Sequence, residues 1–294
     1  MRIIIKIISA LIPSKRLRKL VRRRLTPYDQ HALKKAISQL PYRPIVKDTD
    51  ETIDEIVKNK KSICRLGDGE FLLMKGEGIP FQNADDTLRK RLQEILNSDD
   101  EQVLVGINYL YWNLTDDVAS NLYHPSRRFL NKFAAENLAS ITAQLNPNKT
   151  YYRSDFTSIY ASMQNYDFEN YFKKIQTLWD KRDVTIICGK GVFDEIENSI
   201  FANAQSIEFQ YAPLEHAFNE YDNLLRSALK INKERLVISI LGPTATVLCY
   251  DLTQNGYQAL DLGHIAKDYD YFMKSTKITL RESYKYTDRP NTKR

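Results

Sequence analysis

The chain has 294 residues, 43% hydrophobic and 27% charged, which suits a globular protein with a substantial core and excludes general disorder. The net charge of +6 arises in residues 1–35, which contain eleven Lys or Arg against one acid. The remaining 32 basic and 36 acidic residues make the rest of the chain slightly acidic, so we expect no nucleic-acid binding by the core.

The chain begins with an apolar segment and continues with a basic one. Residues 1–12 are apolar but too few to span a bilayer, and they lack the cleavage site of a secretory signal. Residues 14–25 have the period of an amphipathic helix, with seven Lys or Arg around an apolar face. Such a helix suits an anionic membrane surface. We therefore expect residues 1–25 to hold a cytoplasmic protein on the inner face of the plasma membrane; a solvated helix, or one packed on a partner, is the alternative.

We expect Pro41 and Pro44 to mark the entry to the core. We expect three parts: a basic amphipathic N-terminal extension over residues 1–41, one main domain over 42–275, and an exposed C-terminal tail over 276–294, rich in Lys, Thr and Arg.

Helical and strand patterns alternate through the main domain. The hydrophobic period predicts helices over residues 50–59, 85–97, 127–145, 192–202, 217–230 and 244–254, and strands over 61–66, 102–107, 183–188, 205–210, 235–241 and 257–262. Several strands are continuously apolar, as expected when helices cover both faces of a sheet. The pattern predicts an α/β fold with a mainly parallel sheet flanked by helices.

The most informative motif is Cys64-Arg65-Leu66-Gly67-Asp68-Gly69-Glu70-Phe71, which follows a predicted strand. It places the carboxylates of Asp68 and Glu70 on a glycine-flanked turn. Such oxygen ligands suit Mg²⁺ or Mn²⁺, which usually share their coordination shell with substrate phosphates. Gly67 and Gly69 allow a ligand to approach closely. An ordinary surface turn is the alternative interpretation.

Four later segments also lie at or just after predicted strands: residues 153–157, 188–191, 241–245 and 256–264. In a parallel sheet the carboxyl ends of the strands meet at one edge, where ligands bind. We therefore expect these segments and the Asp68/Glu70 pair to form one site.

Five segments occur in this order: Arg-Leu-Gly-Asp-Gly-Glu, Arg-Ser-Asp-Phe-Thr, Cys-Gly-Lys-Gly, Leu-Gly-Pro-Thr-Ala and Gly-Tyr-Gln-Ala-Leu-Asp-Leu-Gly-His. With this series, the chain resembles the GT-D-type bacterial glycosyltransferases over about residues 45–275. The resemblance implies a Rossmann-like core and Mn²⁺ or Mg²⁺ on Asp68 and Glu70. It also implies transfer of a glucose- or galactose-type sugar from a UDP-sugar to a growing surface or glycoprotein glycan, such as a capsule or a lipid-linked glycan. The basic N-terminal extension lies outside the resemblance.

Several residues are candidates for binding the donor. Arg65 and Arg153 would clamp the diphosphate, or would instead bridge core carboxylates. The turn Gly189-Lys190-Gly191 is expected to open a helix whose first N–H groups bind phosphate, with a tight structural turn as the alternative.

Two further segments extend this donor site. Gly242, Pro243 and Thr244 break a strand and start a helix, where Thr244 would cap the helix or bind the ligand. In Asp261-Leu262-Gly263-His264, Asp261 would hold a ribose hydroxyl and His264 would face the diphosphate, although a lone His is more often structural.

Three residues are candidates for the general base that deprotonates the acceptor hydroxyl: Asp155, Glu215 and His216. The sequence does not rank them. Aromatic residues would stack on uracil or on the acceptor sugar, or would simply pack in the core: Tyr109, Tyr111, Trp112, Tyr151 and Tyr152.

Two other hypotheses remain open. One is a Rossmann-type NAD- or S-adenosylmethionine-dependent enzyme that uses the Gly189-Lys190-Gly191 turn, although Asp194 stands where the third glycine of a dinucleotide fingerprint would be. The other is a non-catalytic scaffold of a glycan-assembly complex at the membrane. A homo-oligomer is compatible with each. Cys64, Cys188 and Cys249 are expected to be buried small hydrophobes, without a disulfide or zinc site.

Overall fold

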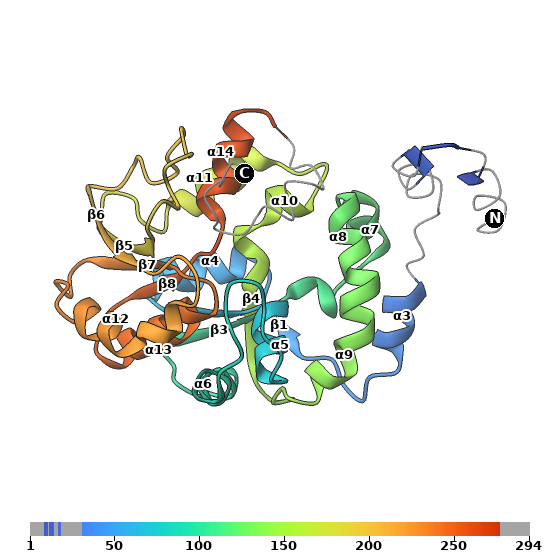
Figure 1. The fold of residues 1–294 in the computed structure, drawn as a ribbon, viewed down its shortest axis with the longest axis horizontal. Coiled ribbons are helices and arrows are strands. Elements are labelled where there is room, and N and C mark those ends of the chain that lie inside the picture. Colours follow the sequence, from blue (N-terminus) through green and yellow to red (C-terminus); the bar gives the residue numbers. More distant parts are fainter. Residues whose placement is uncertain (1–8, 11, 15–16, 19–30, 277–294) are drawn as a thin grey trace.

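The computed structural model describes residues 9–10, 12–14, 17–18 and 31–276 (Figure 1). The helix expected over residues 14–25 and the tail expected over 276–294 lie almost entirely outside these residues. Within them, no helix combines the length and the apolar character needed to cross a membrane.

The core of the molecule is an eight-stranded sheet in the order β1-β4-β3-β2-β8-β7-β5-β6. Every pairing among these strands is parallel, which confirms the predicted parallel α/β fold. The strands are β1 (Ile45–Val46), β2 (Ser62–Leu66), β3 (Val103–Ile107), β4 (Thr150–Arg153), β5 (Asp183–Gly189), β6 (Ser206–Ala212), β7 (Leu236–Ile240) and β8 (Ala259–Asp261). The sequence pattern does not reveal β1 and β4, which have only two and four residues.

Helices cover both faces of this sheet (Figure 1). One face carries α4 (Thr49–Lys58), α10 (Ile159–Ser162), α11 (Phe168–Gln176) and α14 (Ile265–Met273), and the other carries α5 (Asp68–Met74), α6 (Asp86–Leu96), α12 (Tyr221–Ala228) and α13 (Pro243–Gln254). A further group lies beyond β1: α3 (His31–Ser38), α7 (Asp116–Asn121), α8 (His124–Phe129) and α9 (Ala135–Thr142). Helix α3 buries Leu33 and Ile37 against this group.

Local sequence explains where the predicted helices begin. At α4, the Asp48 carboxylate accepts a hydrogen bond from the Glu51 N–H at 2.9 Å, and the Glu51 carboxylate accepts one from the Asp48 N–H at 3.0 Å. This reciprocal capping satisfies N–H groups that a helix start leaves unpaired. At α6, Asp85 caps the Leu88 N–H at 2.7 Å. The helix expected over 127–145 is present as α8 and α9 joined by a π-helical turn over Leu130–Ala134.

The helix predicted over residues 192–202 is wrong, because this segment forms successive turns. Its apolar residues have a helical spacing, but tertiary contacts take up the backbone groups instead. The N–H groups of Glu197 and Asn198 donate to the Asp270 carboxylate on α14, and the Ile200 carbonyl accepts from the Trp179 indole N–H. A helix would need these groups for its own hydrogen bonds.

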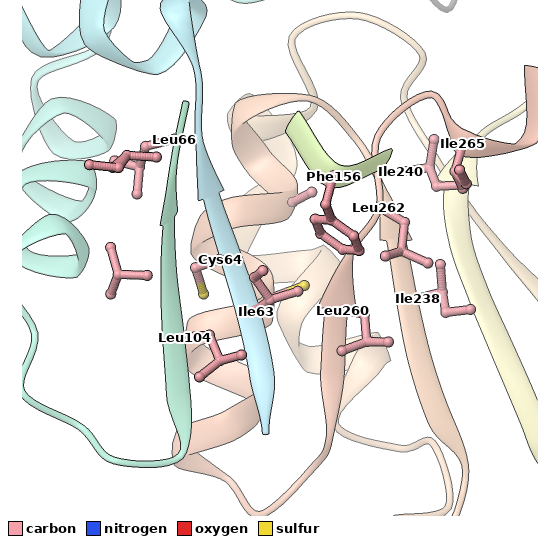
Figure 2. Packing of buried hydrophobic residues seen from close by; sticks show 14 of the residues in the cluster. Ile63, Cys64, Leu66, Leu104, Phe156, Ile238, Ile240, Leu260, Leu262 and Ile265 are labelled. Carbon is pink, nitrogen blue, oxygen red and sulfur yellow. The ribbon is translucent and has the colours of Figure 1, made fainter. Parts of the chain in front are cut away.

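Buried aliphatic and aromatic side chains hold the layers together. Figure 2 shows side chains from neighbouring strands gathered around the sheet, among them Ile63 of β2, Leu260 of β8 and Ile238 of β7. Ile63 and Leu260 are direct neighbours in the β2–β8 register. The three cysteines, Cys64, Cys188 and Cys249, are buried, as expected.

Candidate functional site

Five polar motifs meet at one edge of the sheet, as the sequence predicts. The strands that carry them end at Leu66 (β2), Arg153 (β4), Gly189 (β5), Ile240 (β7) and Asp261 (β8). Because these strands are parallel and adjacent or nearly so, their carboxyl ends lie side by side. One surface cavity of about 530 Å³ lies beside β5 and β6, and another of about 580 Å³ lies beside α12.

Asp68 and Glu70 lie in the first turn of helix α5, whereas the sequence predicts a loop turn. Gly67 precedes the helix as its N-cap residue, and its N–H donates to Oε2 of Glu70 at 2.7 Å. The helix start therefore fixes one carboxylate oxygen of Glu70. Its other oxygen has no hydrogen-bond partner among the described residues.

The surroundings of this pair oppose its negative charge. Burial raises the pKa of Glu70 to about 7, the Gly67 N–H opposes this shift, and the nearby Asp261 and Asp68 carboxylates add to it. The pKa of Asp68 is also raised, because the surrounding protein atoms partly desolvate its carboxylate. The residue is nevertheless exposed at the surface, so a ligand can reach it. Within residues 31–276, no Lys or Arg forms an ion pair with either carboxylate.

This donor set fits a divalent cation that is only partly held by protein. No group of three or more His, Cys, Asp or Glu side chains that could hold a metal occurs among the described residues. Two carboxylates are nevertheless the usual protein share of a Mg²⁺ site, because water and substrate phosphates complete its shell. A cation would also supply the positive charge that the pair lacks.

Arg65 and Asp261 form a buried ion pair, the second of the two alternatives predicted for Arg65. Nη2 of Arg65 lies 2.9 Å from Oδ1 of Asp261. Nη1 donates to the carbonyl of Ser154 at 3.0 Å and to Oγ1 of Thr157 at 2.8 Å, both in the 3-10 helix η3 (Ser154–Thr157). Oδ2 of Asp261 accepts from Thr246 at 3.4 Å. Asp261 is thus occupied by protein groups, which weakens its predicted role with a ribose.

Gly263 makes room for this ion pair. Its φ of +50° lies in the left-handed region, and a Cβ atom at this position would lie 2.1 Å from Nη2 of Arg65. A glycine is therefore required here for two reasons: the left-handed backbone conformation, and the lack of room for a Cβ atom beside the Arg65 guanidinium. His264 follows as the N-cap residue of α14.

Arg153 and Asp155 form a second internal pair. Nη2 of Arg153 lies 2.7 Å from Oδ2 of Asp155, and Oδ1 of Asp155 accepts from the Tyr109 N–H at 2.9 Å. The Arg153 guanidinium also lies 4.8 Å from the centre of the Tyr109 ring. Both oxygens of Asp155 are engaged, so Asp155 is a poor candidate for the general base.

A loop over residues 79–83 joins the acidic pair to the other side of the site. The Ile79 side chain lies 3.2 Å from the position of a Cβ on Gly69, and the Phe81 ring lies 2.8 Å from that of a Cβ on Gly242. The Phe81 carbonyl accepts from the His216 N–H at 2.8 Å. No pattern in the sequence indicates this loop, because its contacts are with residues far away in the chain.

The hydrogen bond of His216 bears on its role. Nδ1 of His216 accepts from the Asn83 N–H at 3.1 Å. A neutral ring with Nδ1 accepting carries its proton on Nε2, so Nε2 then donates and cannot act as a base. His216 also has a φ of +54°, which is unusual for a residue with a side chain. Glu215, beside it, is half-buried.

The Gly189-Lys190-Gly191 segment is a tight turn and does not open a helix, so the predicted helix N-terminus for phosphate is absent there. A Cβ on Gly189 would lie 2.9 Å from the Cα of Leu214, which explains this glycine by close packing. Lys190 is exposed.

The buried hydroxyl groups of Thr244 and Tyr111, near this edge, lack hydrogen-bond partners within the described part of the chain. Thr244, at the start of α13, is fully buried and its Oγ1 has none, so it does not cap the helix. The hydroxyl of Tyr111, which follows β3, also has none. Burial raises the pKa of Tyr111, and the charges of Asp68, Asp155 and Glu70 add to the shift, so its hydroxyl lies within reach of their field. An unpaired buried hydroxyl costs about 1–3 kcal/mol, which a ligand can recover.

A model of the GT-D family, described as the glycosyltransferase GT-D fold, matches residues 63–289. This covers most of the chain. The chain belongs to the GT-D glycosyltransferase family. The family match confirms the resemblance seen in the sequence.

Named relatives and solved structures agree with this assignment. The chain is 29% identical over 249 residues to the probable glycosyl transferase Gly of Streptococcus gordonii and 30% identical over 257 residues to glycosyltransferase GlyD of Streptococcus pneumoniae serotype 4, covering 84% of this chain each time. It spans only 36% and 30% of the length of these two proteins.

The similar structures are of about the same size as this chain. A domain of unknown function 1792 described as having a distinct glycosyltransferase fold superposes with a TM-score of 0.75 at 30% identity, covering 84% of this chain and 87% of that one. A glycosyltransferase of the same domain type from Streptococcus sanguinis gives a TM-score of 0.73 at 26% identity, covering 80% and 86%. These findings favour glycosyl transfer over the NAD or S-adenosylmethionine hypothesis, which also needed a helix after Gly191.

Glu70 should make the stability of the protein depend on pH. Its pKa is about 7 in the folded state against an ordinary value of 4.5, so the unfolded state loses this proton first as pH rises. The free energy of unfolding should therefore fall as pH rises from about 5 to 7, and then level off. This one group should account for a decrease of up to about 3 kcal/mol. In urea titrations with a chelator present, Glu70→Gln should lack this decrease. The exposed Glu101→Gln is the control, and parallel profiles for all three proteins would refute the assignment.

Replacing Gly263 should destabilise the protein through Arg65. Gly263→Ala combines a left-handed backbone with a clash against the guanidinium, so we expect a loss of about 3 kcal/mol or more in urea unfolding. Gly76→Ala is a matched control, because φ is +83° but a Cβ there meets nothing within 4 Å. It should lose only about 1–2 kcal/mol. Equal losses in both variants would show that the clash with Arg65 does not matter.

Proposed function

We propose that this chain is a metal-dependent hexosyltransferase that moves a glucose- or galactose-type sugar from a UDP-sugar to a growing bacterial surface or glycoprotein glycan. The observation that carries the proposal is the Asp68/Glu70 pair, which lies at the carboxyl edge of a GT-D-family sheet. No Lys or Arg among the described residues forms an ion pair with either carboxylate. Such a pair suits a divalent ion held jointly with a diphosphate.

The reaction breaks the bond between the anomeric carbon of the sugar and the diphosphate, and it forms a bond from that carbon to the acceptor oxygen. Negative charge develops on the departing UDP, so stabilising that charge is the main task of the site. A bound Mn²⁺ or Mg²⁺ would supply positive charge at the diphosphate. Asp68 and the free oxygen of Glu70 would hold it.

Other groups at the edge are suited to the donor. Helix α13 begins without a side-chain cap, so the positive end of its dipole suits a phosphate. The unpaired hydroxyls of Thr244 and Tyr111 would regain hydrogen bonds from donor oxygens or from bound water. Lys190 adds an exposed positive charge at the end of β5.

Glu215 is our choice for the general base, because it is half-buried just after the carboxyl end of β6, beside a His216 ring whose Nδ1 accepts from Asn83. Glu215 follows β6 on the same side of the sheet and is adjacent to His216. In this arrangement His216 donates from Nε2 and orients an oxygen, while Glu215 accepts the proton of the acceptor hydroxyl.

Calorimetric titration of UDP, with and without Mn²⁺, tests the donor site. The wild-type chain should bind UDP in a Mn²⁺-dependent manner, and Asp68→Asn with Glu70→Gln should weaken that binding more than about tenfold, because both ligands of the ion are lost. Asp99→Asn with Glu101→Gln is the matched control: it has the same spacing of acids on an exposed loop before β3.

Two results would contradict the proposal. One is a wild-type chain that does not bind UDP under any metal condition, and the other is an Asp68/Glu70 variant that binds like the control. Binding of NAD or S-adenosylmethionine in place of UDP would support the Rossmann-enzyme hypothesis, and full glycan synthesis by the Asp68/Glu70 variant in cells would support the scaffold hypothesis.

The basic N-terminal extension would place this enzyme beside a lipid-linked acceptor at the inner face of the membrane. In vesicle sedimentation, the full chain should bind phosphatidylglycerol vesicles and should release them as salt rises, because each basic residue contributes about 1 kcal/mol. The chain lacking residues 1–25 should not bind. Replacing Lys and Arg by Gln within residues 15–24 keeps the apolar face and should also abolish binding. Unchanged binding by the shortened chain would refute membrane association through this segment.

A further inference from the structure

Strand β6 is the outer strand of the sheet at the end opposite β1 (Figure 1), and it exposes large apolar side chains. Ile207, Phe209 and Tyr211 are 37%, 44% and 58% exposed. Alternate residues of a strand point to the same face, so the three side chains form one apolar row. The backbone groups along the outer side of β6 have no hydrogen bonds to the described part of the chain.

The two edges of this sheet differ in a way that matters for pairing. Natural edge strands are usually short, or carry Lys, Pro or a bulge that blocks pairing with another chain. The β1 edge is short, with two residues. The β6 edge has seven residues, no Lys, no Pro and a continuous register with β5 from Ser206 to Ala212. It therefore has the features of an edge that is paired with another strand.

The aromatic side chains of β6 are already ordered. The rings of Phe209 and Tyr211 stack at 6.1 Å with an angle of 8° between their planes, and Phe193 packs edge-on against Phe209 at 5.3 Å. Side chains that are fixed before binding lose little conformational entropy when a partner arrives. This ordering suits a permanent contact.

We propose that β6 pairs in antiparallel fashion with β6 of a second copy of this chain, about a twofold axis at Phe209, to form a continuous sheet through both copies. The sequence of the strand is complementary to itself in this register. Phe209 faces Phe209, Ile207 faces Tyr211, and both pairs lie in the apolar row.

The remaining pairs of this register are also compatible. Glu208 faces Gln210, and Ser206 faces Ala212, so no two like charges are opposite each other. Because of the twofold axis, each pair of different residues occurs twice in the contact. Twofold symmetry is also the commonest symmetry of protein dimers. Since the carboxyl edge that holds the Asp68/Glu70 pair takes no part in the contact, both sites stay open.

Sedimentation velocity of the full chain tests the dimer. The wild-type protein should sediment as a dimer, and Phe209→Lys should sediment as a monomer, because it puts two like charges at the centre of the contact. Val57→Lys is the matched control, since Val57 is 42% exposed on α4, away from β6. It should remain a dimer. A monomeric wild-type chain, or a dimer that persists in Phe209→Lys, overturns the proposal.

Disulfide trapping tests the register. Directly opposite residues of antiparallel strands have Cα atoms about 4.5–5.5 Å apart, which a disulfide can bridge. Phe209→Cys should cross-link to itself under mild oxidation, and a mixture of Ile207→Cys and Tyr211→Cys should cross-link where neither does alone. The native cysteines are buried and should not interfere.

Two further results overturn the proposal. One is Ile207→Cys linking to itself as well as Phe209→Cys does, which would mean a different register or random collision. The other is a wild-type monomer that becomes a dimer only after residues 277–294 are removed, which would mean that the chain covers its own edge.

Discussion

The carboxyl edge of the sheet depends on the buried ion pair between Arg65 and Asp261. It ties β2 to β8, and through Ser154 and Thr157 it ties both to the segment after β4. Leu66 and Gly67 follow Arg65 directly and lead into α5, so the ion pair lies next to the start of the helix that carries Asp68 and Glu70. Removing one partner of a buried pair costs about 3–5 kcal/mol, because the other charge stays buried.

The same surroundings that make this pair strong make the site beside it unfavourable without a ligand. Burial and neighbouring acids oppose the charge of Glu70, and the hydroxyls of Thr244 and Tyr111 have no hydrogen-bond partner among the described residues. Proteins tolerate such costs mainly where a ligand later offsets them. The polar groups at this edge thus divide into two sets: those satisfied by other protein groups, such as Arg153 and Asp155, and those that a metal ion and a nucleotide would satisfy.

The parts of the fold that could be predicted are those with a strong local signal. Strands such as β7 are continuous apolar runs, and α4 and α6 have acidic caps, so both are visible in the sequence. The segment 192–202 misleads, because the helical spacing of its apolar residues serves packing while Asp270 takes its backbone N–H groups. Helix α5 is hidden for the opposite reason: Gly67 and Gly69 suggest a turn, but Glu70 caps the helix start.

The sequence by itself determined the parallel α/β architecture, the family and the acidic pair, because each shows as a local pattern or as short motifs in a fixed order along the chain. Only the tertiary structure decided which polar side chains are left for a ligand. Arg65 forms a hydrogen bond with Asp261, 196 positions away in the chain, and His216 forms one with Asn83, 133 positions away. These partners meet because the strands are ordered differently in the sheet and in the sequence, with β8 next to β2, so hydrogen-bond partners cannot be inferred from local spacing.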